Sequence, residues 1–358
     1  QIIFILFVIT HETYMERCLQ LASLGAGNVA PNPMVGAVLV HNDVIIGEGY
    51  HQKYGQAHAE VNCINNVSKN LQHLIHLSTL YVSLEPCSHF GKTPPCSDFI
   101  IEHKIKKVVI GCIDKFEKVN GSGIEKLQSA GIEVIIEVLQ EKCETLNKRF
   151  FTFHQKQRPF IILKWAQTTD KKIANSSKEN TSERLFITND FTNTVVHKWR
   201  SEEAAILVGT NTALLDNPSL TNRLWKGKNP TRLVIDTALK LPLTLELFNQ
   251  QQKTIVFNYL QHQEDENLFY YQLNKGEDVV QQILKACFKL NIQSILIEGG
   301  ASLLQSFINQ NLWDEARIIT NQSLQINEGL SAPNLVGNLL NEENYFTDNI
   351  QYFTPLQK

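Results

Sequence analysis

Short apolar runs recur along the whole chain, and most are followed by apolar residues at helical spacing. The clearest runs, residues 80–84, 108–112, 160–165 and 294–297, are typical of strands buried on both faces. Strands that alternate with helices predict α/β domains with mostly parallel sheets covered on both faces. A length of 358 residues favours two such domains.

The segment 150–159 (FFTFHQKQRP) breaks the periodicity and predicts an interdomain junction. We therefore expect a first domain over residues 11–149 and a second over 158–358. The apolar run 2–9 (IIFILFVI) is too short to span a bilayer and lacks the flanks of a signal peptide. We interpret it as an extension outside the first domain.

Charge and cysteine content restrict the partners. Residues 1–148 hold 12 Lys and Arg against 15 Asp and Glu, and residues 149–358 hold 21 of each kind. Neither half has the basic excess of a nucleic-acid-binding protein, so we expect a small-molecule substrate, no nucleic acid and no membrane partner. The seven scattered cysteines do not suggest a disulfide scaffold and favour a reducing, cytoplasmic location. The sequence is compatible with a homo-oligomer.

One histidine and two cysteines form the strongest motif. His58-Ala59-Glu60 is followed by Pro86-Cys87 and then by Cys96. One imidazole and two thiolates predict a zinc site with an open fourth position, as a catalytic zinc requires, and such a zinc lowers the pKa of bound water to about 7. Glu60 is then the candidate acid and base, as in zinc deaminases. The alternative is two buried cysteines and an unrelated histidine.

The spacing of the two cysteines departs from the usual deaminase pattern. Eight residues separate Cys87 from Cys96, where two are typical. Both can bind one metal if the loop bulges out and returns, with Cys96 at the start of a helix that favours its thiolate.

Several longer stretches resemble the bifunctional riboflavin-biosynthesis deaminase/reductase family. They are residues 31–38 (PNPMVGAV), 47–51 (GEGYH), 58–61 (HAEV), 84–96 (LEPCSHFGKTPPC) and 121–134 (GSGIEKLQSAGIEV). The resemblance implies an N-terminal cytidine-deaminase-like three-layer domain and a C-terminal dihydrofolate-reductase-like α/β domain. It also implies that zinc hydroxide deaminates a diaminopyrimidinone carrying a ribosylamino 5-phosphate, and that NADPH then reduces the ribosyl group to ribityl.

The same resemblance suggests substrate contacts in the first domain. They are Asn32, His51, His89 and Lys92. Other interpretations stay open, because Asn32 is also suited to capping a turn, Lys92 to solvation and His89 to supporting the metal ligands.

The signals in the second half are weaker. Residues 297–301 (IEGGA) join a strand to a helix, and the glycines allow a phosphate to approach the helix N-terminus. They do not form the Rossmann fingerprint, and a plain strand-to-helix turn fits equally well. The resemblance implies NADPH contacts at Ala166, Phe186, Thr212, Asp216, Gly299, Gly300, Ala301, Ser302 and Leu303.

Four further residues of this half are expected to contact substrate by the same resemblance. They are Arg200, Leu220, Arg223 and Glu298. The two arginines would clamp the phosphate, although each is also suited to a surface ion pair.

One family motif is altered. Ser-Leu-Asp-Gly is replaced by residues 168–171 (TTDK), so Lys171 stands where the family has glycine. If the turn needs a positive φ, we expect Lys171 to weaken the reductase more than it weakens folding. Ser182 and Arg184 compete for one further substrate position.

Two other functions remain open at this point. The first is a zinc deaminase of another nucleobase or of nucleic acid, with a degenerate, non-reducing second domain. The second is a non-enzymatic scaffold with a structural zinc.

Overall fold

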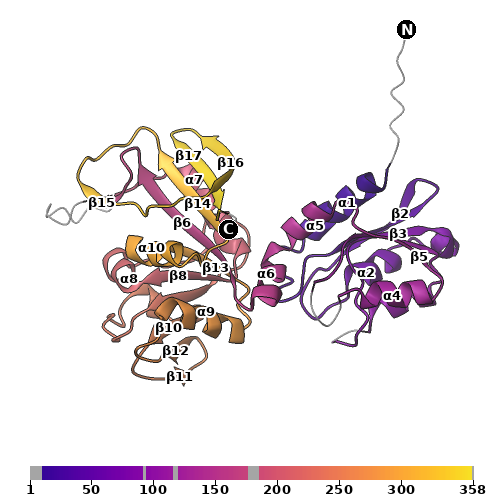
Figure 1. The fold of residues 1–358 in the computed structure, drawn as a ribbon, viewed down its shortest axis with the longest axis horizontal. Coiled ribbons are helices and arrows are strands. Elements are labelled where there is room, and N and C mark those ends of the chain that lie inside the picture. Colours follow the sequence, from indigo (N-terminus) through magenta and orange to yellow (C-terminus); the bar gives the residue numbers. More distant parts are fainter. Residues whose placement is uncertain (1–9, 92–93, 116–119, 176–184, 357–358) are drawn as a thin grey trace, which may run out of the picture. The chain divides into compact units, whose positions relative to one another are not determined.

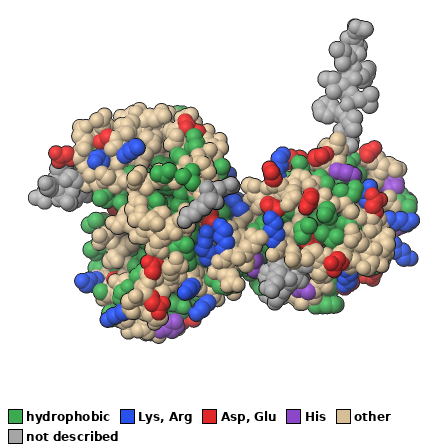
Figure 2. All heavy atoms as spheres, in the orientation of Figure 1, with side chains coloured by type: hydrophobic (Ala, Val, Ile, Leu, Met, Phe, Trp, Pro, Cys, Tyr) green, Lys and Arg blue, Asp and Glu red, His purple; other side chains and the backbone are tan. Residues whose placement is uncertain are grey.

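The computed structural model of the chain describes residues 10–91, 94–115, 120–175 and 185–356. It divides into two compact units, Gln1–Lys156 and Gln157–Lys358 (Figure 1). None of the described helices is long and apolar enough to cross a membrane. Charged side chains of both signs are spread over the face of each unit that Figure 2 shows.

The first unit is built on a five-stranded sheet with the order β2-β1-β3-β4-β5. Its elements are α1 (His11–Ser23), β1 (Gly36–His41), β2 (Val44–Tyr50), α2 (Ala59–Asn65), the 3₁₀ helix η1 (Gln72–Leu77), β3 (Thr79–Leu84), α3 (Cys96–Glu102), β4 (Lys107–Cys112), α4 (Ser122–Ser129), β5 (Glu133–Ile135), α5 (Gln140–Leu146) and α6 (Lys148–Lys156). The β3–β4 and β4–β5 pairs are parallel, whereas β1 is antiparallel to both β2 and β3. This sheet is therefore less parallel than expected.

Helices cover both faces of this sheet. Along β1, Ala37 and Leu39 pack in a buried cluster with residues of α2, α3 and α4. The intervening Val38 and Val40 pack in a second cluster with residues of α1 and α5. The expected three-layer arrangement is confirmed, since successive side chains of a strand point to opposite faces.

The second unit contains a ten-stranded sheet with the order β11-β12-β10-β9-β8-β13-β6-β14-β17-β16 and a small β15–β7 sheet. Its elements are β6 (Phe160–Thr168), β7 (Lys172–Asn175), α7 (Asp190–Glu202), β8 (Ala205–Gly209), α8 (Thr210–Asp216), β9 (Thr231–Ile235), the 3₁₀ helix η2 (Glu246–Phe248), β10 (Thr254–Asn258), β11 (Gln263–Glu264), β12 (Leu268–Gln272), α9 (Val279–Lys289), β13 (Ser294–Gly299), α10 (Ala301–Asn309), β14 (Glu315–Asn321), β15 (Gly329–Ser331), β16 (Asn338–Tyr345) and β17 (Asp348–Thr354).

From β12 through β10, β9, β8, β13 and β6 to β14, neighbouring strands of the large sheet are parallel to one another. Antiparallel pairs involve only β11 at one end and β17 and β16 at the other. Alternate residues of β6 again enter two clusters, Ile161 and Leu163 with residues of α9 and α10, and Phe160 and Ile162 with residues of α7 and α8. The α/β class predicted for this half is confirmed.

The segment 150–159, predicted as the interdomain junction because it breaks the periodicity, is largely helical. Helix α6 covers Lys148–Lys156 and buries Phe150, Phe151 and Phe153. Phe150 and Phe151 belong to a core cluster of the first unit, so packing of this aromatic face against the core stabilises the short helix.

Lys171 has the positive φ for which the family's glycine would be suited. Its φ is +56°, in the left-handed region, and it occupies the turn between β6 and β7. Its backbone N–H donates to the Thr168 carbonyl (3.0 Å), and its own carbonyl accepts from Ala332 N–H (2.8 Å). These bonds hold a left-handed turn that glycine adopts without steric cost.

Replacing Lys171 by glycine should therefore stabilise the second unit. We expect Lys171→Gly to raise its free energy of unfolding by about 1 kcal/mol, because a side chain in the left-handed region is strained. All four tryptophans of the chain, Trp165, Trp199, Trp225 and Trp313, lie in this unit, so denaturant unfolding followed by their fluorescence reports on it selectively. The matched control Lys172→Gly, in strand β7, should lower the stability. A lower free energy of unfolding in Lys171→Gly than in the unaltered protein would contradict the idea that Lys171 is strained.

Candidate active sites

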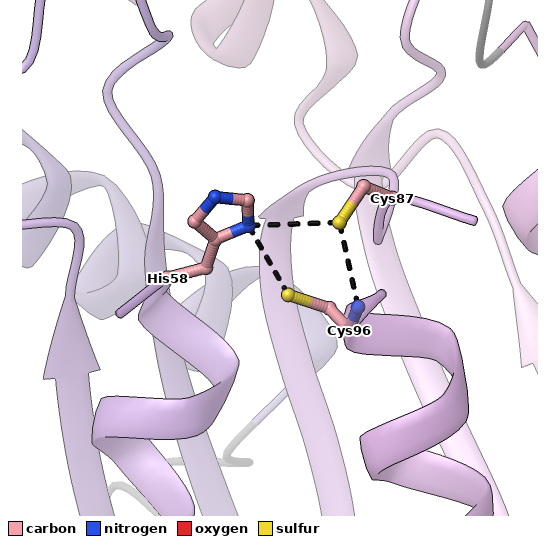
Figure 3. A group of neighbouring side chains, drawn as sticks. All are labelled: His58, Cys87 and Cys96. Atoms are coloured by element: carbon pink, nitrogen blue, oxygen red, sulfur yellow. Dashed lines mark hydrogen bonds between the residues drawn. The ribbon is translucent and has the colours of Figure 1, made fainter. Parts of the chain in front are cut away.

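His58, Cys87 and Cys96 come together in the first unit, and their side chains point toward one another (Figure 3). His58 Nδ1 lies 3.2 Å from Cys96 Sγ and 3.6 Å from Cys87 Sγ, and the three donor atoms all lie within 4.8 Å of one another. His58 caps α2 and Cys96 begins α3, whereas Cys87 lies in the loop after β3. The eight-residue insert does bring both thiols to one point. One nitrogen and two sulfur donors suit zinc with an open position.

The two thiols of this cluster differ, because the hydrogen bond with Cys87 and burial raise the pKa of Cys96, whereas the surroundings of Cys87 favour its ionisation. Hydrogen bonds from Cys96 and His58 outweigh burial and lower the pKa of the Cys87 thiol to about 4. The backbone N–H of Cys96 also donates to Cys87 Sγ at 3.4 Å. Thiolates are the form that binds metal.

Glu60 lies in the first turn of α2, two residues after His58, and is buried. Burial raises the pKa of its carboxyl above the ordinary value, although His58 opposes the shift. A buried carboxyl beside three metal donors can exchange protons with a molecule bound at the open position.

Two of the expected substrate contacts lie next to the cluster. The His51 and His58 rings meet edge to face, with centroids 5.2 Å apart. His51 Nδ1 donates to the Ala57 carbonyl (3.1 Å), so Nε2 accepts from the Asn32 amide nitrogen (3.1 Å). Burial lowers the pKa of His51, which keeps its ring neutral. Of the other two, His89 is exposed in the loop after Cys87, and Lys92 lies outside the described residues.

In the second unit, the glycine turn stands at the end of β13, beside α8. Gly299 has a φ of +155°, and a Cβ placed on either Gly299 or Gly300 would lie 3.1 Å from Thr212 Oγ1. Helix α10 begins directly afterwards at Ala301, followed by Ser302 and Leu303. The expected NADPH contacts Thr212, Gly299 and Gly300 thus lie together at a helix N-terminus, and we call this group the glycine cradle. The two glycines carry no side chains there, which suits the binding of a cofactor phosphate.

The remaining expected cofactor contacts are more scattered. Ala166 is half-buried on β6, which is paired with β13, and Asp216 is exposed at the end of α8. Phe186 is 78% exposed before α7. Ser182 and Arg184 lie outside the described residues.

A cavity of about 310 Å³ collects three of the four expected substrate contacts. Arg200, Leu220 and Arg223 line it, together with Asn217, Pro218, Ser219 and Glu246. The fourth, Glu298, binds Arg200 through both carboxylate oxygens at 2.8 and 2.6 Å. Burial opposes ionisation of Glu298, but Arg200 and Lys164 lower its pKa to about 2, so the pair is ionised.

Arg223 contributes a cation of a different kind. It is exposed, its guanidinium donates to the Ser219 and Thr221 hydroxyls, and no described carboxylate forms an ion pair with it. Its backbone N–H donates to Nδ1 of His197 (2.9 Å). Burial and the two arginines lower the pKa of His197 to about 4, so the ring stays a neutral acceptor.

Arg232 is a functional candidate that the sequence did not suggest. It is fully buried on β9 and donates to the carbonyls of Ser219 (2.9 Å) and Glu246 (3.1 Å), both of which line the cavity. Asn217 ties the same two segments together by accepting from Glu246 N–H (2.8 Å). The partners of Arg232, which also include Asn249 Oδ1 (2.8 Å), lie 13 or more residues away in the chain, so no local sequence pattern signals this role.

Known proteins match both units. Residues 8–112 match the cytidine and deoxycytidylate deaminase zinc-binding region, and residues 159–322 match the RibD C-terminal domain. The riboflavin biosynthesis protein RibD of Aquifex aeolicus is 38% identical over 333 residues, 90% of each chain. That of Actinobacillus pleuropneumoniae is 40% identical over 305 residues, 82% of this chain and 79% of that one. The chain belongs to the RibD family.

Solved RibD structures agree with this assignment. The deaminase/reductase of Thermotoga maritima superposes with a TM-score of 0.85 at 35% identity, covering 96% of this chain and 98% of that one. RibD of Acinetobacter baumannii gives a TM-score of 0.86 at 29% identity, covering 97% and 99%. The predicted fold, with a cytidine-deaminase-like and a dihydrofolate-reductase-like part, is confirmed.

Membership of the RibD family makes the chain a bifunctional deaminase and reductase of riboflavin biosynthesis. Zinc and NADPH are its cofactors, as expected from the sequence, and the donor cluster and the glycine cradle fit them. A deaminase with a degenerate second domain is not supported, because the second unit matches the RibD reductase domain.

The zinc ligands can be tested by metal analysis. We expect about one zinc per chain in protein purified without chelators, and less than about a tenth of that in Cys87→Ser or Cys96→Ser, because two protein donors hold zinc poorly. Cys63→Ala, which removes a buried thiol of α2 outside the cluster, should keep one zinc. Full zinc content in both ligand variants would exclude this cluster as the site.

Proposed function

We propose that residues 11–149 deaminate a diaminopyrimidinone ribosylamino 5-phosphate and that residues 158–358 reduce the product. The name of the Thermotoga maritima relative describes these two steps, a diaminohydroxyphosphoribosylaminopyrimidine deaminase and a 5-amino-6-(5-phosphoribosylamino)uracil reductase. The observation that carries the deaminase assignment is the convergence of His58, Cys87 and Cys96 beside the buried Glu60.

In the deamination step, zinc supplies an activated water when bound. Glu60 would carry one proton of this water to the ring nitrogen and the other to the amino group, which leaves as ammonia while the oxygen stays on the ring carbon. Asn32 is oriented by His51, which accepts one of its amide hydrogens. No described donor lies on Asn32 Oδ1, so this oxygen is directed to accept from a ring N–H or a ribose hydroxyl. His89 and Lys92 remain proposed contacts from the loop after Cys87.

In the reduction step, NADPH supplies the hydride when bound. The turn from Gly299 to Leu303, Thr212 and Asp216 would hold its phosphates and ribose, with Ala166 and Phe186 near the remainder. The substrate would lie in the cavity lined by Arg200, Leu220 and Arg223.

The two arginines of this cavity have unequal roles in our proposal. Glu298 neutralises Arg200 and orients it as a hydrogen-bond donor to the sugar. Arg223 forms no ion pair with a described carboxylate and therefore carries the positive charge that binds the substrate phosphate. Lys171 lies in the turn after β6, and its effect on the rate remains a prediction.

We also propose that the enzyme acts in the cytoplasm on small molecules, without nucleic acid or membrane partners. The support is the absence of a basic excess in either half and the scattered, odd number of cysteines. A homo-oligomer is compatible with this function.

The role of Glu60 can be tested with Glu60→Gln. Ammonia release should fall at least about a hundredfold, because the amide cannot transfer protons, while zinc content and reductase turnover stay unchanged. Glu102→Gln, an equivalent change at an exposed site of the same unit, should leave ammonia release intact. Normal ammonia release in zinc-loaded Glu60→Gln would remove Glu60 from proton transfer.

The role of Arg223 can be tested with Arg223→Ala. The KM of the reductase for its phosphorylated substrate should rise about 10–100-fold, since a charge-assisted hydrogen bond contributes about 1.5–3 kcal/mol. Cofactor affinity and kcat should change little. Lys226→Ala removes an exposed cation three residues away and should leave KM unaltered. An unchanged KM in Arg223→Ala would place the phosphate elsewhere.

A further inference from the structure

Cys87 differs from the other two candidate zinc ligands in the backbone element that carries it. His58 and Cys96 stand at helix starts, whereas Cys87 lies in a loop between β3 and α3. On one side, this loop is held by α3, where Ser97 N–H donates to the Cys87 carbonyl (3.1 Å) and Cys96 N–H to its sulfur (3.4 Å). The opposite side needs an anchor as well, because a thiolate that moves changes the metal geometry.

Glu85 supplies that anchor from two residues before Cys87. Its carboxylate is buried at 4% exposure and accepts four backbone N–H bonds, two on each oxygen. The donors are Asp114 (3.1 Å), Gly121 (3.0 Å), Gly123 (2.9 Å) and Ile124 (3.4 Å). Three of them belong to the start of α4, where a carboxylate is favoured by the unpaired N–H groups and the helix dipole.

The two residues that flank Cys87 are held by the same helix turn. A Cβ on Gly123 would lie 2.0 Å from the Pro86 carbonyl oxygen, so the helix backbone packs directly against Pro86. On the other side of Cys87, the Ser88 and Ser122 hydroxyls are hydrogen-bonded at 2.6 Å. Glu85, Pro86 and Ser88 are thus all anchored to residues 121–124.

We propose that Glu85 is a positioning residue of the deaminase, which docks the first turn of α4 under Cys87 and so sets the place of this zinc ligand. Glu85 touches neither substrate nor metal donors in this role. The first residues of α4 suit this role, because Gly123 lets the helix backbone pack against Pro86 and Ser122 forms a hydrogen bond with Ser88. The consequence is a zinc site whose third ligand depends on a helix that begins 34 residues further along the chain than Ser88.

The test is Glu85→Gln in the full-length protein, with Glu125→Gln as its matched control. Glutamine keeps the size of the side chain but turns one acceptor oxygen into a donor that faces backbone N–H groups. Glu125 lies on the same helix and is exposed. We expect zinc affinity, measured by competition with a chromophoric chelator, to fall about 10–100-fold in Glu85→Gln, as for other groups that orient metal ligands. Reductase turnover, the internal control for folding of the second unit, should not change.

Two further readouts distinguish positioning from general destabilisation. In cobalt-substituted protein, Glu85→Gln should shift the thiolate-to-cobalt absorption, and in zinc-saturated protein it should lower kcat for ammonia release more than it raises KM. Glu125→Gln should match the unaltered protein in both. Unaltered zinc affinity and cobalt absorption in folded Glu85→Gln would overturn the proposal.

If Glu85→Gln does not fold, Ser122→Ala decides the question, since it removes only the contact to Ser88. It should shift the cobalt absorption and lower zinc affinity by a smaller factor, and an unaltered spectrum with unaltered affinity would overturn the proposal. A wild-type protein without zinc would instead refute the metal site itself.

Discussion

The central strands of the two large sheets are buried on both faces, and this burial restricts where the chain can carry chemistry. Ala37 and Leu39 enter one cluster while Val38 and Val40 enter the other, so a shift of one residue in β1 would exchange the two faces. Strand register is therefore strongly specified. With both faces covered by helices, the zinc donor cluster lies after β3 in the first unit and the glycine turn after β13 in the second.

Three buried charged side chains of this protein are held by hydrogen bonds. Glu85 is surrounded by backbone N–H groups, Arg232 by carbonyls and Glu298 by the Arg200 guanidinium. Each arrangement offsets the cost of removing an ion from water, and each fixes a segment that carries functional side chains. These three charged side chains thus hold segments that lie next to the candidate sites.

The two sites solve the problem of loop positioning in different ways. The zinc site uses helix starts on both sides of a loop, because metal geometry tolerates little displacement. The reductase cavity uses a buried arginine and an asparagine to join residues 217–220 to Glu246. Its two arginines differ in their surroundings: Arg200 is held by Glu298, whereas Arg223 extends from an exposed loop.

The sequence alone determined the features that depend on neighbouring residues. Apolar runs predicted β3, β4, β6 and β13, since a strand buried on both faces must be apolar throughout. The candidate zinc donors His58, Cys87 and Cys96 were also visible, because a zinc site restricts residue types, and the candidate acid and base Glu60 was visible from its place beside His58. Helix α9 could have been found as well, from the cap Asp278 and the buried residues at positions 280, 283, 284 and 287.

Other features were decided only by tertiary structure. Helix α7 buries the polar Thr192 and His197 alongside Val196 and Trp199, and the edge strand β16 is mostly exposed and polar. The roles of Glu85 and Arg232 depend on backbone atoms far away in the chain, which no local pattern encodes. The left-handed turn at Lys171 is held by bonds to Thr168 and to Ala332, so its conformation follows from packing against a distant segment and not from the preference of lysine.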